Sequence, residues 1–147
     1  GAVLMGAFTF VVPGEPVPKG RARASAFAGR VRMFTPAKTR RFEDRVRAVA
    51  VRDWRDPPLA RETPIVLVAT FWLPVPRSWS RKRQSAAVEG LLLPTSKPDL
   101  DNLVKAISDG MNGVVYQDDS AIVETRNAKR YSADPRVEVE LMWRALV

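Results

Sequence analysis

The sequence contains neither cysteine nor histidine among its 147 residues. Without cysteine, the chain has no disulfide framework, thiolate nucleophile, zinc finger or iron–sulfur cluster. Without histidine, it has no Ser-His-Asp triad, no imidazole base and no His-ligated metal. Any catalysis must therefore use carboxylates, lysine, arginine, hydroxyl groups or a hard cation bound by oxygen.

Long apolar runs are also missing, since none approaches the roughly 20 residues that a membrane-spanning helix requires. The opening segment 1–8 is apolar but short and lacks a preceding basic region, so we do not expect a signal peptide. A hydrophobic share of 46% is ordinary for a globular chain, and the length suits one domain. We expect one domain over residues 1–147 in a soluble, cytoplasmic protein.

Positive charge is plentiful, with 24 Lys and Arg against 16 Asp and Glu, a net charge of +8 that favours nucleic acid or an anionic surface as partner. Residues 15–61 hold 13 basic and 5 acidic side chains, and residues 77–83 add four basic ones without an acid. Residues 97–130 reverse the balance, with 6 acidic and 5 basic side chains. This layout is expected of an enzyme that holds a polyanion and cuts it, although a solvated basic face remains an alternative.

Hydrophobic periodicity and breaker residues predict a mixed α/β order. A capping Thr35 before Pro36 marks a helix that ends by Asp56, and the nearly continuous apolar run 65–73 predicts a central buried strand. The remaining expected elements are a strand at 7–12, a mobile basic loop at 13–30, a short strand at 31–34, a short basic helix or loop at 77–90, a linker at 91–96, a helix from Asp99 to Asn112, and strands at 122–131 and 137–143. The turn at 132–135 would join the last two strands as a hairpin. The expected fold is α+β, with a small mixed sheet and two main helices.

The chemistry is concentrated in the acidic segment 97–120. Pro98 helps to fix the helix start, which places Asp99 at or near the N-cap. Asp101 lies one turn before Lys105, so both project away from the apolar stripe of the helix. The neighbouring acids Asp118 and Asp119 fall in the turn before the strand at 122–131, where they could return to the helix start.

Three or four carboxylates without histidine or cysteine suit a hard ion such as Mg²⁺ or Mn²⁺. Ions bound in this way activate water and bridge phosphate oxygens during phosphodiester hydrolysis. Lys105 would add a positive charge beside the phosphate or the leaving oxygen.

Each feature also has a structural interpretation. Asp99 alone is a helix cap, Asp101 and Lys105 alone are a surface ion pair, and Asp118 with Asp119 is an ordinary turn. An Asp-x-Asp pattern also occurs in glycosyltransferases, which generally need a larger nucleotide-binding fold than this chain provides. In combination with the basic half, the acidic segment favours a metal-dependent nuclease.

Several motifs together resemble the RusA family of Holliday-junction resolvases. The resemblance rests on Lys97-Pro98-Asp99-Leu100-Asp101-Asn102-Leu103-Val104-Lys105, Asn112-Gly113-Val114-Val115-Tyr116-Gln117-Asp118-Asp119-Ser120, Pro16-Val17-Pro18-Lys19-Gly20-Arg21-Ala22-Arg23, Thr35-Pro36-Ala37-Lys38-Thr39, Pro76-Arg77-Ser78-Trp79-Ser80, and the segment from Lys129 to Val137. It covers almost the whole chain. It implies a small homodimeric endonuclease that resolves four-way DNA junctions by paired nicks with Mg²⁺ or Mn²⁺, in DNA recombination and repair.

Carried over by position, the resemblance makes Asp99, Asp101 and Asp119 the essential carboxylates and metal ligands, and Lys105 the essential lysine. Asp118 matches a neighbouring acidic position that could also bind metal. We expect the DNA backbone to be held by basic side chains of the first half, namely Lys19, Arg21, Arg23, Arg40 and Arg41.

One departure from the family pattern is Ser108-Asp109-Gly110, where a more regular helix is usual. Because glycine costs about 1 kcal/mol relative to alanine inside a helix, we expect the last turn to fray. Two rival functions stay open, a nuclease acting on flaps, replication forks or RNA, and a DNA-structure-binding protein without catalysis.

Overall fold

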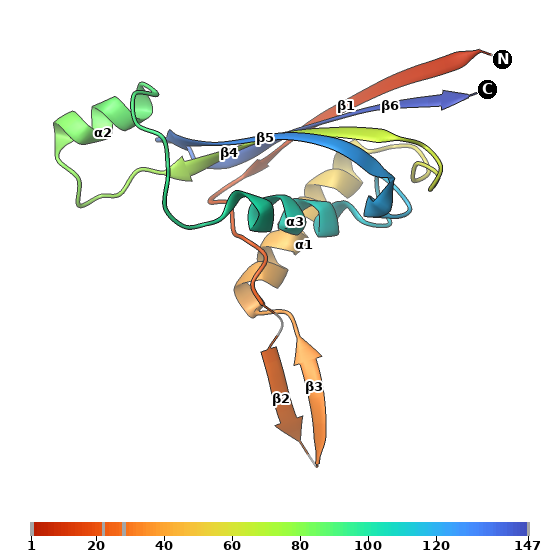
Figure 1. Ribbon diagram of the computed structural model, residues 1–147, viewed down its shortest axis with the longest axis horizontal. Helices are drawn as coiled ribbons and strands as arrows, with labels where there is room; N and C mark the ends of the chain where they lie inside the picture. The colour runs from red at the N-terminus through yellow and green to blue at the C-terminus, as the bar shows by residue number, and fades with distance from the viewer. Residues whose placement is uncertain (1, 22, 28, 147) are drawn as a thin grey trace.

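The computed structural model describes residues 2–21, 23–27 and 29–146 and contains strands, helices and one 3-10 turn (Figure 1). The strands are β1 (Val3–Pro13), β2 (Arg23–Phe27), β3 (Arg30–Phe34), β4 (Ile65–Pro74), β5 (Ile122–Ser132) and β6 (Arg136–Leu146). The helices are α1 (Ala37–Asp53), α2 (Arg81–Val88), α3 (Leu100–Met111) and the 3-10 turn η1 (Asp119–Ala121).

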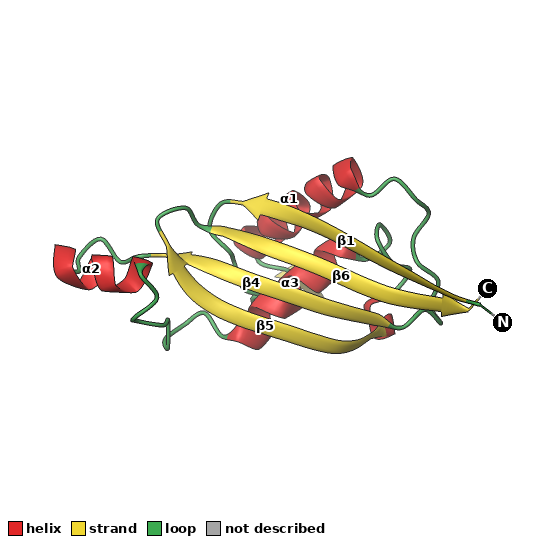
Figure 2. Cartoon of the chain, turned by 90° about the horizontal axis from the view of Figure 1, so that it is seen from above, coloured by secondary structure: helices red, strands yellow, loops and turns green. Residues whose placement is uncertain are grey.

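Four strands form one mixed sheet in the order β1-β6-β4-β5 (Figure 2). β6 runs antiparallel to both of its neighbours, β1 and β4, whereas β5 runs parallel to β4. The parallel pair is connected through α2 and α3, as such a pair requires a long crossover. The expected α+β class with a small mixed sheet is therefore confirmed.

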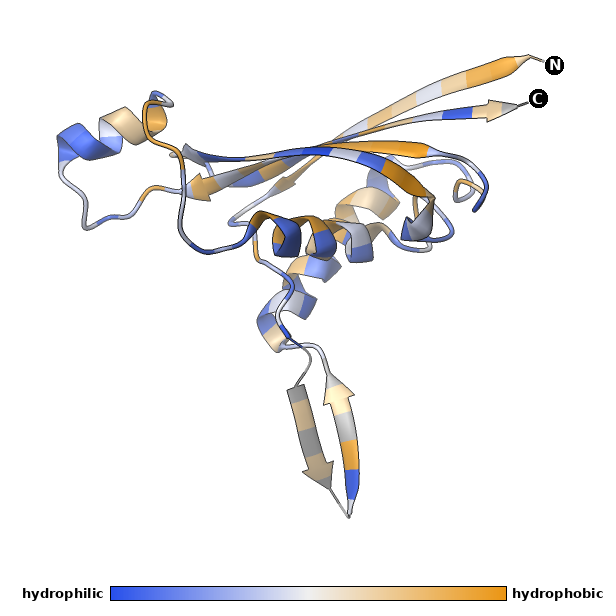
Figure 3. Cartoon of the chain, in the orientation of Figure 1, coloured by the Kyte–Doolittle hydropathy of each residue, from blue (hydrophilic) through white to orange (hydrophobic). Residues whose placement is uncertain are grey.

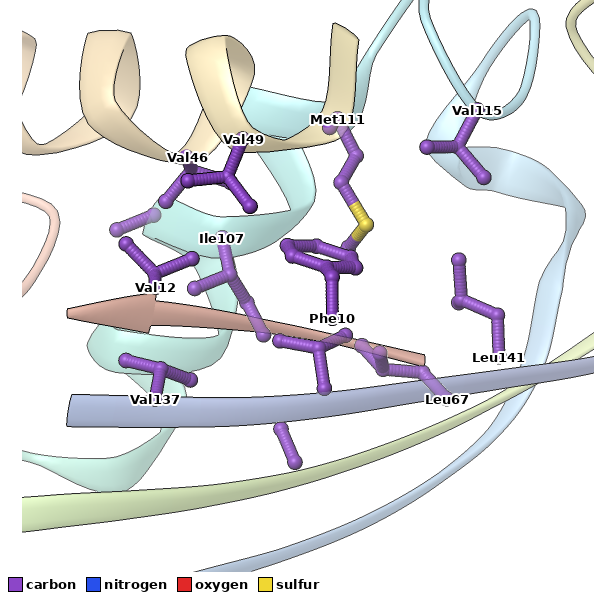
Figure 4. Close-up of a cluster of buried hydrophobic side chains, with 14 of the residues drawn as sticks. Phe10, Val12, Val46, Val49, Leu67, Ile107, Met111, Val115, Val137 and Leu141 are labelled. Carbon is purple, nitrogen blue, oxygen red and sulfur yellow. The ribbon is translucent and has the colours of Figure 1, made fainter. Parts of the chain in front are cut away.

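Helices α1 and α3 cover one face of this sheet, and the core lies between the two layers (Figures 1 and 2). Side chains from β1, β4 and β6 point toward apolar side chains of both helices (Figure 4). The alternating burial of β4 shows why, because every second residue from Ile65 to Leu73 is buried while those between them are half-buried. The core members at this interface include Phe10, Val12, Val46, Val49, Leu67, Ile107, Met111, Val137 and Leu141.

The predicted hairpin of the last two strands is wrong, because β4 lies between β5 and β6. β4 is apolar along its whole length and needs a partner on each side, which a central position supplies. β5 carries exposed charges such as Glu124 and Arg126, which suit a sheet edge. The turn at 132–135 therefore crosses over the end of β4 instead of pairing its two neighbours.

The predicted mobile loop over residues 13–30 is also wrong in part. Its second half enters a hairpin, in which β2 pairs with β3 and projects away from the body of the molecule (Figure 1). Its first half is fixed, because the Gly20 N–H donates to Thr39 Oγ1 at 3.0 Å and the Thr39 hydroxyl donates to Pro18 O at 3.0 Å. The Lys19 N–H also donates to Asn102 O at 2.8 Å, so this segment lies against both helices.

The expected fraying of the last turn before Asn112 is not found, since α3 continues to Met111 and Gly110 is buried. A Cβ atom at Gly110 would lie 2.7 Å from Val46 Cβ and 3.1 Å from Glu43 O. Glycine is thus required for the close approach of α3 to α1, and this contact outweighs its poor helix propensity. Within the described part of the chain, no helix has both the length and the apolarity to cross a membrane.

Candidate active site

Two acids, the half-buried Asp99 and the exposed Asp101, lie at the start of α3. Asp99 is the N-cap residue, as predicted, but its side chain does not cap the helix and instead accepts a hydrogen bond from Lys97 Nζ at 2.7 Å. Asp101 is exposed, and its Oδ1 accepts the Asn102 N–H at 2.9 Å. Both carboxylates therefore keep oxygen atoms directed to solvent at the start of α3.

The turn before β5 brings two more acids toward this helix. Asp118 caps η1, where its Oδ2 accepts the Ser120 N–H at 3.1 Å. Hydrogen bonds from the Ser120 side chain and backbone hold the pKa of Asp118 below its usual range. Asp118 thus stabilises the turn. Asp119 contacts α3 instead, since its Oδ2 lies 3.5 Å from Lys105 Nζ.

Lys105 connects the middle of α3 with this turn. Its Nζ lies 3.0 Å from Asp109 Oδ1, one helical turn further on. The hydrogen bond to Asp109 is the main reason why the pKa of Lys105 is raised, with Asp119 adding to it. The described side chains show no ion pair between Asp101 and Lys105, so the interpretation of these two residues as a simple surface pair is wrong.

Lys19 is committed to the protein itself. Its Nζ lies 2.6 Å from Glu43 Oε1 on α1 and 3.0 Å from Asp109 Oδ2 on α3. Partial burial opposes the charged form, but the hydrogen bonds to Glu43 and Asp109 prevail and raise the pKa of Lys19. Lys19 thus joins the 14–20 segment to both helices, and its role as a DNA contact stays a prediction.

Asp109 is the residue that sequence reasoning missed. Its two carboxylate oxygens bind different lysines, Lys105 and Lys19, and its side chain is only 18% exposed. The four-residue spacing from Lys105 was a usable signal for one of these contacts. No sequence pattern indicated that Lys19 and Glu43 would meet at the same place.

A hollow of about 450 Å³ lies beside Asp101, between the start of α3 and β5. Val104 and Leu100 form its apolar wall, and Thr125 and Asn127 line the side of β5. Asn127 Nδ2 donates to Thr125 Oγ1 at 2.7 Å, while its buried Oδ1 has no hydrogen-bond partner. Asn127, which sequence reasoning did not single out, thus lines the same hollow as a predicted metal ligand, although its acceptor oxygen is buried.

The donor chemistry of this region fits a hard cation. Residues 97–119 carry five aspartates and two lysines. Among the described residues, however, no three acidic side chains already converge on one point. Asp99, Asp101, Asp118 and Asp119 therefore have suitable oxygens for Mg²⁺, but each is engaged with a neighbouring group of the protein.

The predicted DNA contacts other than Lys19 lie around the N-terminal half of α1. Arg21, Arg40 and Arg41 are exposed, and none forms an ion pair with a described residue. Arg23 begins β2, and its side chain lies outside the part that the structure describes. Arg21 directly follows the fixed 14–20 segment, and Arg40 and Arg41 follow Thr39, the residue of α1 that binds this segment.

Comparisons with known proteins agree with this arrangement. A family model described as endodeoxyribonuclease RusA matches residues 13–142, which include the basic segment, the acidic segment and every strand of the sheet at least in part. The chain is also 41% identical over 137 residues to the uncharacterized protein YqaN of Bacillus subtilis (strain 168), covering 92% of this chain and 95% of the relative. The chain belongs to the RusA family of endodeoxyribonucleases, hydrolases that cut phosphodiester bonds within DNA.

Proposed function

We propose that this protein is a Mg²⁺- or Mn²⁺-dependent endonuclease that resolves four-way DNA junctions by paired nicks, in recombination and repair. The observation that carries the proposal is the acidic segment 97–119 at α3, in a basic chain of an endodeoxyribonuclease family. Its carboxylates are the donors that such ions prefer, and the chain offers no histidine or cysteine in their place.

Asp99, Asp101 and Asp119 are the proposed metal ligands, with Asp118 as a further candidate beside them. The cation would supply an activated water and neutralise charge on the scissile phosphate. The contacts to Lys97, Asn102 and Lys105 hold the carboxylates apart in the conformation described. Ion binding thus requires that these side chains turn toward a common point.

Lys105 is the proposed cation for the reacting phosphate. Asp109 fixes its ammonium group in the middle of α3, beside the turn that carries Asp119, and a lysine with a raised pKa is fully charged at neutral pH. A fixed positive charge stabilises the charge that develops on phosphate and leaving oxygens. Lys105 therefore acts without giving up or taking a proton.

A homodimer completes this proposal, because a junction is cut on two strands and a two-fold axis supplies two equivalent sites. Sedimentation equilibrium of the free protein tests this point, and a monomer at micromolar concentration would contradict it. A cytoplasmic location is also part of the proposal, since the substrate is DNA.

The decisive experiment is Asp101→Asn with a synthetic four-way junction. Asp101 is exposed, so we expect normal folding and normal junction binding but loss of nicking in Mg²⁺. Asp134→Asn is the matched control, because Asp134 is exposed in the turn between β5 and β6 and should leave nicking unchanged. Normal nicking by Asp101→Asn would refute the site, and normal wild-type nicking in excess EDTA would refute the metal.

A panel of substrates separates the rival functions. We expect the four-way junction to be cut faster than flaps, replication forks, RNA hairpins and linear duplex of the same sequence. Faster cutting of flaps or RNA would assign the enzyme to that substrate. Tight junction binding without cut strands in Mg²⁺ and in Mn²⁺ would identify a DNA-structure-binding protein.

A further inference from the structure

We propose that a basic platform, formed by the start of α2 and the residues just before it, binds the phosphate backbone of the DNA strand next to the scissile phosphate. The platform is defined here as Arg77, Trp79, Arg81, Lys82 and Arg83. The inference rests on the proposed function for its substrate, and it adds a contact surface that lies outside the acidic segment and the basic first half.

The charge of the platform is uncompensated. Arg77, Arg81, Lys82 and Arg83 are all exposed, and none of them forms an ion pair within the described part of the chain. No acidic residue occurs between Glu62 and Glu89. Such a cluster carries mutual repulsion that a polyanion relieves, and Lys and Arg clustered on one element are typical of DNA-binding surfaces.

Two members of the platform, Arg83 and Trp79, are held in place by side-chain contacts. The Arg83 guanidinium lies 3.8 Å from the centre of the Trp79 ring, and Trp79 packs edge-on against Tyr131 at 5.4 Å. Gln84 Nε2 donates to Trp79 O at 2.7 Å. Because these contacts already order Arg83 and Trp79, binding through Arg83 loses less conformational entropy than it would with a free arginine.

A hollow beneath α2 provides a place for a phosphate group. It measures about 670 Å³ and lies between α2 and the turn at 132–135. Arg77 and Arg81 line it together with the polar side chains of Gln84 and Ser132, and Glu89 is its one acidic lining residue. Two guanidinium groups on one concave surface match the bidentate recognition of phosphate oxygens.

Strand β5 connects the platform to the acidic segment. Lys129 Nζ donates to Ser96 O and Pro98 O at 2.9 Å each, which anchors the backbone directly before Asp99. Tyr131, the partner of Trp79, lies two residues further along β5, a separation of about 7 Å in a strand. A DNA strand that reaches Asp99 therefore has the platform within a few nucleotides.

The position of α2 supports this role. It lies at the end of the sheet from which α3 begins, and its hydrophilic N-terminal end points away from the body (Figures 1 and 3). Only Ala87 of this helix is buried, so α2 contributes little to the core. Substitution of its exposed basic residues should therefore leave the fold intact.

The test compares two pairs of charge-removing substitutions. Arg81→Gln with Lys82→Gln removes two platform charges. Arg55→Gln with Arg144→Gln removes two exposed charges elsewhere, since Arg144 pairs with Met5 near the end of β6 and Arg55 follows Trp54, which packs on Trp143. Binding to a four-way junction is measured in EDTA, where no cutting occurs, over a series of salt concentrations. Loss of two phosphate contacts should make the slope of log K against log salt less steep by about 2 in the platform variant, with the control close to wild type.

A second measurement locates the contact on the DNA. Single methylphosphonates, which lack the phosphate charge, are placed one at a time near the branch point. At one or two positions they should weaken wild-type binding several-fold but leave the platform variant unaffected. Equal losses in the platform and control variants, or no position with this behaviour, would overturn the proposal. Because binding is measured without metal, a failure to nick in Mg²⁺ would refute the proposed function separately.

Discussion

Replacing Gly110 with alanine tests the closest contact between the two helices that support the site. The new Cβ would lie 2.7 Å from both Cβ and Cγ1 of Val46, whereas carbon atoms pack best at about 3.5–4.0 Å. Relief of this clash requires α1 and α3 to separate by roughly 1 Å. Val46 Cβ and Glu43 O cannot rotate away, because one is attached to the backbone of α1 and the other belongs to it.

The change in the free energy of unfolding expected for Gly110→Ala is the balance of two opposing effects. Overpacking of a core typically costs about 1–3 kcal/mol, and the fixed neighbours place this case toward the upper end. Alanine is favoured over glycine inside a helix by about 1 kcal/mol. We therefore expect Gly110→Ala to lower the free energy of unfolding by about 1–2 kcal/mol.

Urea unfolding followed by circular dichroism measures this difference. In a Val46→Ala background, where the Cγ1 contact is absent, Gly110→Ala should cost less. Nicking should also fall in the folded variant, because Lys19 joins Glu43 on α1 to Asp109 on α3. A variant more stable than wild type by about 1 kcal/mol would refute the close contact, since helix propensity would then be the only effect.

Two further predictions concern the network around Asp109. Asp109→Asn keeps the shape of the side chain but removes the charged partner of Lys105, so we expect kcat for nicking to fall by roughly 10- to 100-fold with little change in KM. Asp109→Glu should recover part of this rate. Equal losses in binding and turnover would contradict a positioning role for Asp109. The second prediction is that stability falls in strongly alkaline solution. Because the folded-state pKa of Lys19 is raised above its ordinary value of 10.5, its ion pairs contribute fully below that pH and are lost as the pH rises through the raised value. The free energy of unfolding should therefore decline above about pH 10.5, less steeply in Lys19→Met than in wild type, and parallel profiles would show that Lys19 is not responsible.

Much of the fold is encoded in local patterns. The helix after Pro36, the apolar strand from Ile65 and the helix after Asp99 all occur where proline and hydrophobic periodicity predicted them. The predicted Thr35 cap of α1 is wrong, because Pro36 is the N-cap residue and no side chain caps this helix. The pairing of the strands, in contrast, could not be predicted from local patterns. Ser132 to Arg136 has the length and composition of a hairpin turn, yet the apolar character of β4 on both faces determined which strand lies beside β6.

The site was predicted in its residue types better than in its contacts. The motif predicted that these residues lie on or next to one helix and in the turn after it, and the structure shows the same positions for Asp99, Asp101, Lys105 and Asp119. The partners of the lysines depend on how α1 packs against α3, which a motif does not describe. Gly110 illustrates the difference, because propensity predicts a frayed turn and packing makes it the point of closest approach.

The pairing of β1 with β6 has a consequence for how the chain folds. Val3 pairs with Leu146 and Pro13 with Arg136, so the two ends of the described chain lie side by side in one sheet (Figure 1). This ladder closes a loop that contains every other element, and closing so long a loop is slow because its entropy is lost before the pairing is gained. We therefore expect α1 and α3 to form early and the sheet to be completed last. The adjacent ends of the described chain also make the fold suitable for circular permutation, with new ends opened at the exposed residues 89–91.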